Sequence, residues 1–450
     1  MAEINSSSIV ILISAASFMF AITPSFGSLA TYPNGFHNGG TGNCDGCHAR
    51  RAQPAFKNTS SSATGSSTAD LPSPEGQRSM LNGSDPSSTC LLCHSATAGQ
   101  KQASGFLIAS SRESLVAGGV PPSQLTPAGD FGWLLKSYKW SSKGTGANDE
   151  FSPGDSHGHN IVAQDYGFKA DIFNAEAPGG TYPSDKLSCT SCHDPHGNYR
   201  RSANGNISLN GVPIKSSGSY STSADPDSAS TVGTYRLLAG AGYQPVALTG
   251  DFAFEADPPA AISPLEYNRA ETTNDTRVAY GKGMTEWCRN CHVTTHKNSH
   301  PMGSTGKLTA EVIRIYNRYL TSGNIAGSKE NSYNSLVPYE MGTDDYAVLK
   351  TTANSNGSIR NGPKSGATVM CLTCHRAHAS GWDHMTRWNE RNSLIVNEGV
   401  FVGTDSKSAT SIIAAQGRLS AETAKAYYER KSNSFGSYQR SMCSKCHQKD

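Results

Sequence analysis

A pentapeptide of two cysteines, two intervening residues between them and a following histidine recurs six times in this chain and uses all twelve of its cysteines. The cysteines are Cys44, Cys47, Cys90, Cys93, Cys189, Cys192, Cys288, Cys291, Cys371, Cys374, Cys443 and Cys446. The histidines are His48, His94, His193, His292, His375 and His447, which end motifs 1 to 6 in that order. The pattern is typical of c-type haem, whose two vinyl groups bond the thiols while the histidine supplies a proximal axial ligand to the iron. The sequence therefore predicts six haems c.

Two other kinds of site also use paired cysteines. Zinc ribbons repeat a pair separated by two residues, and an exported protein can use cysteines as a disulfide framework. Neither requires a histidine directly after the second cysteine, whereas all six copies have one. Haem attachment accounts for the complete motif and is the favoured interpretation.

The composition indicates that the polypeptide alone forms little core. Hydrophobic residues make up only 36% of the 450 residues, and segments 55–88 and 202–232 have the Ser/Gly/Pro-rich composition of loops. Porphyrins are large apolar plates, and their attachment adds folding free energy that loops lack. We expect a multihaem cytochrome c of mostly irregular coil, with a few short helices and minimal strand, wrapped around a continuous stack of six haems. One such domain should cover residues 31–450.

Few regular elements are predicted between the motifs. The apolar spacing predicts a helix over 308–320, and a second helix is expected over about 420–431 with Ser420 as N-cap. Short strand-like pieces occur near 131–140 and 276–280. No sequence around the motifs recurs, so we expect a repeated site without a repeated fold unit.

The N-terminus is interpreted as a secretory signal peptide over residues 1–30, with cleavage near 27–30. Its apolar run from Ile9 to Thr23 is short for a membrane span, although the preceding segment carries only Glu3 as a charged residue, and an uncleaved anchor is the alternative. No second apolar span follows, so we expect a protein that is not membrane-embedded. It should be secreted through the periplasm to the outer cell surface or the extracellular space.

The charge gives no indication of a nucleic-acid partner. The formal net charge is +2, and no basic patch is evident along the chain. We therefore expect no nucleic-acid binding.

Eight histidines outside the motifs could supply the second axial ligands. They are His37, His157, His159, His196, His296, His300, His378 and His384. His196, His296 and His378 follow a motif histidine by only three or four residues, too close to pass around the porphyrin to the opposite face of the same iron. Each can reach the iron of a second haem instead, so three short segments are predicted to ligate two irons each. His157 and His384 are interpreted as spare.

Iron with histidine on both sides has no open coordination position, and such a haem transfers electrons without binding substrate. None of the six motifs ends in lysine, the variant found in catalytic haems of nitrite-type reductases. We therefore expect an electron carrier and not an enzyme.

The segments between the motifs resemble the outer-surface hexahaem c-type cytochromes of the OmcS family, which polymerise into extracellular filaments, or nanowires, in metal-reducing bacteria. The resemblance runs from about His37 to Asp450 and includes GHNIVAQDY (158–166), CTSCHDPHGNYRR (189–201) and TRVAYGKGMTEWCRNCH (276–292). It implies bis-histidine haems, alternating parallel and T-shaped haem pairs, and head-to-tail assembly. By matching position it implies these distal ligands: His37, His159, His196, His296, His300 and His378.

One position departs from this family. The family carries a histidine three residues after the histidine of motif 1, and that residue ligates a haem of the neighbouring subunit; here the position is Arg51. Either another histidine such as His37 or His384 completes the intersubunit site, or that haem lacks its sixth ligand and the filament is weaker or absent.

Together these features predict extracellular electron transfer by a head-to-tail homopolymer that forms a conductive filament. Its expected partners are further copies of itself, outer-membrane electron-transfer cytochromes and external acceptors such as metal oxides, electrodes or partner cells. A soluble periplasmic electron shuttle and a multihaem oxidoreductase with one open haem site are the alternatives.

Overall fold

The computed structural model describes residues 37, 44–48, 81–96, 106–112, 115, 119–141, 149–209, 211–264, 271–272, 277–295, 300–318, 334–354, 362–391 and 394–447. The predicted signal peptide, Arg51 and His296 lie outside these residues. Within them, no helix is long and apolar enough to cross a membrane.

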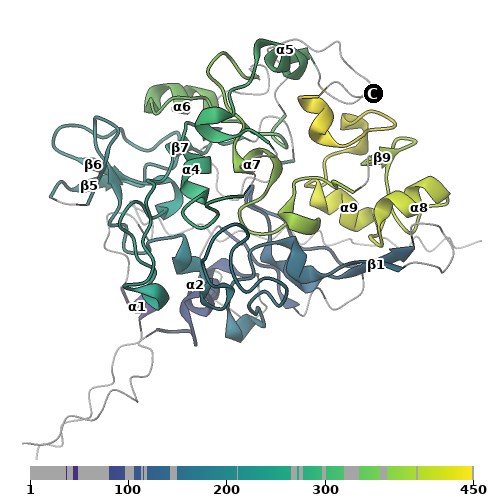
Figure 1. Ribbon diagram of the computed structural model, residues 1–450, viewed down its shortest axis with the longest axis horizontal. Helices are drawn as coiled ribbons and strands as arrows, with labels where there is room; N and C mark the ends of the chain where they lie inside the picture. Colours follow the sequence, from purple (N-terminus) through teal and green to yellow (C-terminus); the bar gives the residue numbers. More distant parts are fainter. Residues whose placement is uncertain are drawn as a thin grey trace, which may run out of the picture.

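Most of the described chain is irregular, and its helices are short (Figure 1). They are α1 (Cys44–Cys47), α2 (Pro86–His94), α4 (Met284–Cys288), α5 (Ala310–Arg318), α6 (Tyr346–Ala353), α7 (Cys371–Cys374), α8 (Ala409–Ala415) and α9 (Ser420–Ala426). Four of them, α1, α2, α4 and α7, carry motif cysteines. Motifs 3 and 6 begin on single 3₁₀ turns, Cys189–Ser191 and Met442–Lys445. The motifs themselves therefore account for much of the regular structure.

The strands have two to four residues each. They are β1 (Tyr138–Ser141), β2 (Asp149–Ser152), β3 (Arg200–Arg201), β4 (Ile207–Ser208), β5 (Ile214–Ser216), β6 (Thr231–Gly233), β7 (Ala261–Ile262), β8 (Ala279–Tyr280), β9 (Val396–Asn397) and β10 (Val400–Phe401). Three antiparallel pairs, β1–β2, β7–β8 and β9–β10, accompany one four-stranded sheet in the order β4-β3-β6-β5, in which only β5 and β6 run parallel. The prediction of little regular structure and minimal strand is confirmed.

Several local predictions are confirmed in part. The helix expected over 308–320 is α5, and the strand piece near 276–280 is β8. Of 131–140, the first half is a 3₁₀ turn (Phe131–Leu135) and the second half begins β1. The loop prediction for 202–232 is wrong where β4, β5 and β6 form, because these short strands pair with β3 and with each other.

The N-cap predicted for the last helix is also wrong. Ser420 is the first residue of α9, and Leu419 precedes it as the N-cap. The carboxylate of Glu422 accepts the backbone N–H of Leu419 at 3.0 Å, so a side chain from inside the helix satisfies the donor. The helix ends at Ala426, before Tyr428 with φ 59°, well short of the expected residue 431.

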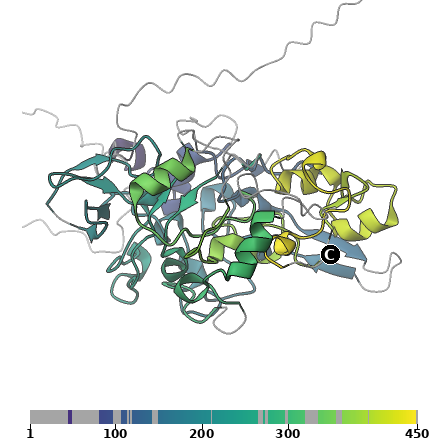
Figure 2. The same cartoon turned by 90° about the horizontal axis from the view of Figure 1, so that it is seen from above.

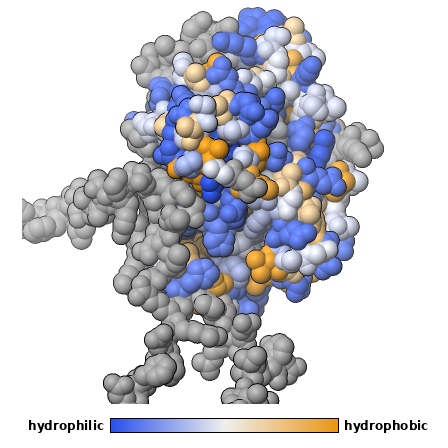
Figure 3. Space-filling view, turned by 90° about the vertical axis from the view of Figure 1, so that its left-hand side faces the viewer, coloured by the Kyte–Doolittle hydropathy of each residue, from blue (hydrophilic) through white to orange (hydrophobic). Residues whose placement is uncertain are grey.

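Buried apolar side chains form several separate clusters, as the low hydrophobic content predicts. The largest joins the β1 region to the C-terminal segment, where Trp133, Tyr138, Trp382 and Tyr427 are all buried. The two segments lie side by side in both ribbon views (Figures 1 and 2), blue against yellow. Figure 3 shows one face of the molecule as mainly hydrophilic with small separate hydrophobic patches.

Candidate haem-binding sites

Four motif histidines hold their rings in place through Nδ1, which lies at hydrogen-bonding distance from a backbone carbonyl. The pairs are His94 with Phe106 at 2.8 Å, His193 with Arg236 at 2.8 Å, His292 with Pro178 at 2.9 Å and His375 with His384 at 2.8 Å. A ring that donates its proton from Nδ1 presents the lone pair of Nε2 to a metal. This arrangement fits an axial ligand of haem iron.

Three predicted distal histidines face motif histidines at a distance that fits one shared iron. The ring centres are 6.4 Å apart for His48 and His196, 6.0 Å for His159 and His292, and 6.3 Å for His300 and His447. Two imidazoles on opposite sides of one metal, each with its nitrogen about 2 Å from it, place their ring centres roughly 6 Å apart. The separations therefore suit bis-histidine coordination.

These pairs connect different motifs. His196 follows His193 in the sequence, yet it faces His48 of motif 1. His159 belongs to a segment before motif 3, yet its ring faces His292 of motif 4. The backbone carbonyl of Ala377, beside motif 5, accepts the Nδ1 proton of His159 at 2.8 Å. His196 thus lies against a motif other than the one it follows, a position that suits the second-haem role predicted for it.

His37 and His378 lie beside motifs 2 and 3. Burial, with the charges of His94 and His193 acting in the same direction, lowers the pKa of His37 to about 4. Burial lowers the pKa of His378 to about 3, with His193 as its strongest charged neighbour. Both rings are neutral at pH 7, which is the form that binds a metal.

One atom of His378 fits a prosthetic group in particular. The ring stacks on Phe131 with centres 4.7 Å apart, and its buried Nδ1 has no hydrogen-bond partner among the described residues. A buried polar nitrogen without a partner is costly, so the surroundings of this ring are incomplete without a further group or an ordered water.

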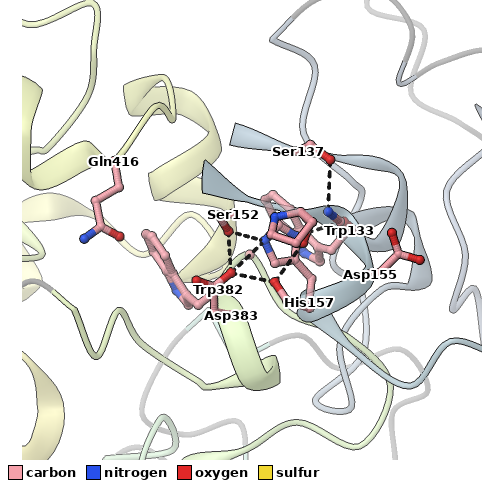
Figure 4. Close-up of polar contacts among 12 residues, drawn as sticks. Trp133, Ser137, Ser152, Asp155, His157, Trp382, Asp383 and Gln416 are labelled. Carbon is pink, nitrogen blue, oxygen red and sulfur yellow. Dashed lines mark hydrogen bonds and ion pairs between the residues drawn. The ribbon is translucent and has the colours of Figure 1, made fainter. Parts of the chain in front are cut away.

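The two spare histidines take other roles. His157 is fully buried, and both its ring nitrogens are engaged, Nδ1 with the carbonyl of Trp133 at 3.0 Å and Nε2 with Oγ of Ser152 at 2.8 Å (Figure 4). Asp383 also bonds Ser152, so the ring belongs to a closed polar network. His384 is exposed and contributes its backbone carbonyl to His375.

Consecutive motifs are neighbours in space. The thiols of Cys90 and Cys189 are close neighbours, which places motif 2 beside motif 3, and those of Cys288 and Cys371 place motif 4 beside motif 5 in the same way. Burial raises the pKa of Cys291, and the neighbouring Cys192 of motif 3 raises it further. Motifs 2 to 5 therefore lie next to one another in the order of the sequence.

The same backbone frame surrounds motifs 3 and 5. The N–H of Asp194 donates to Leu237 at 2.9 Å, as that of Arg376 does to Met385 at 2.9 Å. The carbonyls that hold His193 and His375 belong to Arg236 and His384, whose φ angles are 52° and 57°. The left-handed backbone turns each carbonyl toward its imidazole.

The frame extends to the preceding motif in each case. Ser87, three residues before Cys90, accepts the N–H of Cys189 at 3.1 Å. Thr285, three residues before Cys288, accepts the N–H of Cys371 at 3.3 Å. Motifs 2–3 and 4–5 are thus two copies of one arrangement, and the expectation of no repeated fold unit is wrong. In the sequence, this repeat is signalled by the paired hydroxyls at equivalent positions and by the histidines three residues after His193 and His375.

The comparisons with known proteins agree with this geometry. No protein-family model matches the chain. It is 43% identical over 425 residues to the C-type cytochrome OmcS of Geobacter sulfurreducens, covering 92% of this chain and 94% of that protein. Two solved structures, the outer membrane cytochrome S filament and the OmcS nanowires of G. sulfurreducens, each match with a TM-score of 0.79. They are 43% and 42% identical over 92% of this chain and all of theirs.

Proposed function

The chain belongs to the OmcS family of c-type cytochromes, and from this premise we propose that it carries electrons outside the cell as a head-to-tail filament. The observation that supports this most directly is the set of facing histidines that link one motif to another. Electron transfer between cofactors needs them close together, and shared segments hold neighbouring sites at fixed positions.

We further propose that six haems c are bound, one at each motif, with the motif histidine as proximal ligand. Haem supplies a one-electron couple, and the protein's contribution is to attach, orient and bury it. His196, His159 and His300 would be distal ligands at motifs 1, 4 and 6, facing the motif histidines at 6.0–6.4 Å. His37 would serve motif 2 and His378 motif 3, because His94 and His193 respectively are their strongest charged neighbours. His296, which lies outside the described residues, is the sixth of the predicted distal ligands.

Two histidines on each iron leave no coordination position for a substrate, so the proposed role is transfer and not catalysis. The site of action would be the outer cell surface, reached through the periplasm after removal of the signal peptide. Outer-membrane cytochromes would donate the electrons, and extracellular metal oxides would accept them.

Electron microscopy of the secreted holoprotein tests the filament. We expect unbranched filaments in native medium. Monomers alone at every protein concentration and ionic strength would contradict polymerisation and favour a soluble shuttle.

The oxidoreductase alternative rests on Arg51, which stands where the family has an intersubunit histidine. Electron paramagnetic resonance of the ferric protein separates the two. We expect low-spin signals only, whereas a high-spin signal that changes with cyanide or nitrite would indicate an open haem.

A further inference from the structure

Motifs 3 and 5 share the same backbone hydrogen bonds, but they differ in the side chain that donates to two backbone carbonyls of the motif, one of them that of the proximal histidine. At motif 3 the hydroxyl of Tyr243 donates to the carbonyls of Thr190 at 2.6 Å and His193 at 3.4 Å. At motif 5 the equivalent carbonyls, those of Leu372 and His375, accept Nε of Arg387 at 2.6 and 3.1 Å. A neutral phenol at one site is thus replaced by a guanidinium cation at the other.

The residue after each proximal histidine differs in the same direction. Asp194 follows His193, is 3% exposed, and its carboxylate accepts the N–H of His196 at 3.0 Å and that of Asn198 at 2.8 Å. Arg376 follows His375 and is 1% exposed. An anion therefore lies beside motif 3 where a cation lies beside motif 5.

The two arginines nearest His375 are paired with a single carboxylate. Glu271 accepts Arg376 at 3.0 Å and Arg387 at 2.9 Å, and its backbone carbonyl accepts Arg430 at 2.7 Å. Two guanidiniums thus share one carboxylate, and the third, Arg430, contacts only the backbone of the same residue. Asp383, the residue before His384, is balanced by Arg391 at 3.0 Å.

Other charges near the two sites leave this difference in place. On the Cys371 side of motif 5 lie Arg289 and Glu340, and burial raises the pKa of Glu340 to about 7, so its carboxyl is only partly charged at neutral pH. Glu390 acts on Cys374 of motif 5, and Asp85 acts on Cys189 of motif 3. At motif 3, Arg236 lies over the rings of Phe106 and Tyr220 at 4.6 and 4.9 Å and offsets Asp194. At motif 5 the two buried guanidiniums of Arg376 and Arg387 share the single carboxylate of Glu271. At motif 3 the corresponding groups are the carboxylate of Asp194 and the neutral phenol of Tyr243.

We propose that Arg387 is a positioning residue that also sets the redox energetics of motif 5, giving the haem there a more positive reduction potential than the haem of motif 3. A fixed cation disfavours the oxidised iron, which carries one more positive charge than the reduced iron, and burial strengthens this effect because the surroundings screen charge poorly. An electron moving along the series is then held longer at motif 5. The inference rests on the proposed haem ligation.

Spectroelectrochemical titration of the holoprotein tests this with Arg387→Gln, which keeps a hydrogen-bond donor and removes the charge. We expect one component to become harder to reduce by about tenfold in its equilibrium constant, about 59 mV for a one-electron couple. Arg387→Lys keeps the charge and should shift that component less. The matched control Arg314→Gln removes an arginine that is exposed on α5 and paired with Glu311, and it should shift none.

Asp194→Asn removes a negative charge and should shift a reduction potential in the opposite direction. It should make a different, lower component easier to reduce, and the double variant with Arg387→Gln should bring the two components closer from both sides. Unchanged components in Arg387→Gln, or equal shifts in Arg387→Gln and Arg387→Lys, would overturn the proposal. Haem content and the low-spin spectrum are measured on the same samples. If the unmodified protein contains no haem or shows no low-spin spectrum, the proposed function is overturned. If the haems are intact but the components of Arg387→Gln are unshifted, this inference alone is overturned.

Discussion

Around motif 3 and around motif 5 the backbone follows the same path, whereas the charged groups packed against it differ. His193 and His375 are each oriented by a carbonyl at 2.8 Å that belongs to a left-handed residue. A non-glycine residue in that conformation costs on the order of 1–2 kcal/mol, and the chain accepts this cost at both motifs. The backbone thus fixes how the ligand points, and the side chains Tyr243 and Arg387 distinguish one site from the other.

The strongest way to break the comparison is to remove His378. This residue follows motif 5 in the sequence but lies beside His193 of motif 3, so His378→Ala should open the coordination at motif 3 and leave motif 5 intact. We expect one haem to change from low to high spin, measured by electron paramagnetic resonance. His384→Ala, at an exposed ring, is the control and should remain low-spin. A wholly low-spin His378→Ala protein would remove His378 from the ligand set.

Removing the carboxylate of Glu271 should destabilise the motif 5 region most. Glu271→Gln leaves Arg376 and Arg387 buried without their counter-ion, which costs about 3–5 kcal/mol. Denaturant unfolding, followed by haem absorbance, measures the loss. Asp227→Asn, an exposed acid paired with Lys215, is the matched control and should change stability far less, because solvent screens an exposed pair. Equal losses in both variants would contradict a special role for the buried charges.

The pH dependence of stability tests a second buried carboxyl near motif 5, that of Glu340. Burial raises the pKa of Glu340 from 4.5 to about 7, while Thr368 donates to its carboxyl at 2.8 Å. The folded state therefore holds this proton more tightly than the unfolded state. The resulting stability is fully present below about pH 4.5 and is lost as the pH rises through about 7, by roughly 3 kcal/mol in all.

Glu340→Gln should remove this part of the pH dependence, because the amide does not titrate. Thermal unfolding at pH 5, 6, 7 and 8 provides the measurement. Parallel pH profiles for the unmodified protein and the variant would show that Glu340 titrates normally.

The smallest effects test whether the two copies of the frame are equivalent. Ser87→Ala and Thr285→Ala each remove a buried hydroxyl that accepts a cysteine N–H of the next motif. Each should cost about 1 kcal/mol, and the two losses should agree within experimental error in denaturant unfolding. Clearly unequal losses would show that the shared geometry does not bring shared energetics.

Much of the chemistry could be predicted from the sequence because it depends on neighbours in the chain. The spacing of Cys189, Cys192 and His193 defines a haem attachment motif without any knowledge of the fold. The periodic apolar residues of α5 likewise specify their own helix. The Ser420 cap failed because the hydroxyl and the backbone N–H of Ser420 both donate to the carboxylate of Asp405, fifteen residues away in the chain.

The pairing of sites could not be predicted in the same way. His196 faces a motif histidine 148 positions earlier, and His159 faces one 133 positions later. No sequence pattern predicts which side chain donates to the carbonyl of each motif histidine either. Tyr243 follows His193 by 50 residues, whereas Arg387 follows His375 by 12. No local rule connects residues at such unequal separations.

The sequence by itself thus determined the cofactor chemistry, through six complete motifs and a supply of further histidines. Covalent attachment needs only residues that are adjacent in the chain, so it is independent of the path the chain takes. Only the tertiary structure decided which histidine faces which motif and whether a phenol or a guanidinium covers the ligand. Those choices depend on contacts between distant segments, and the buried surroundings of motif 5 make the charge of one such contact count.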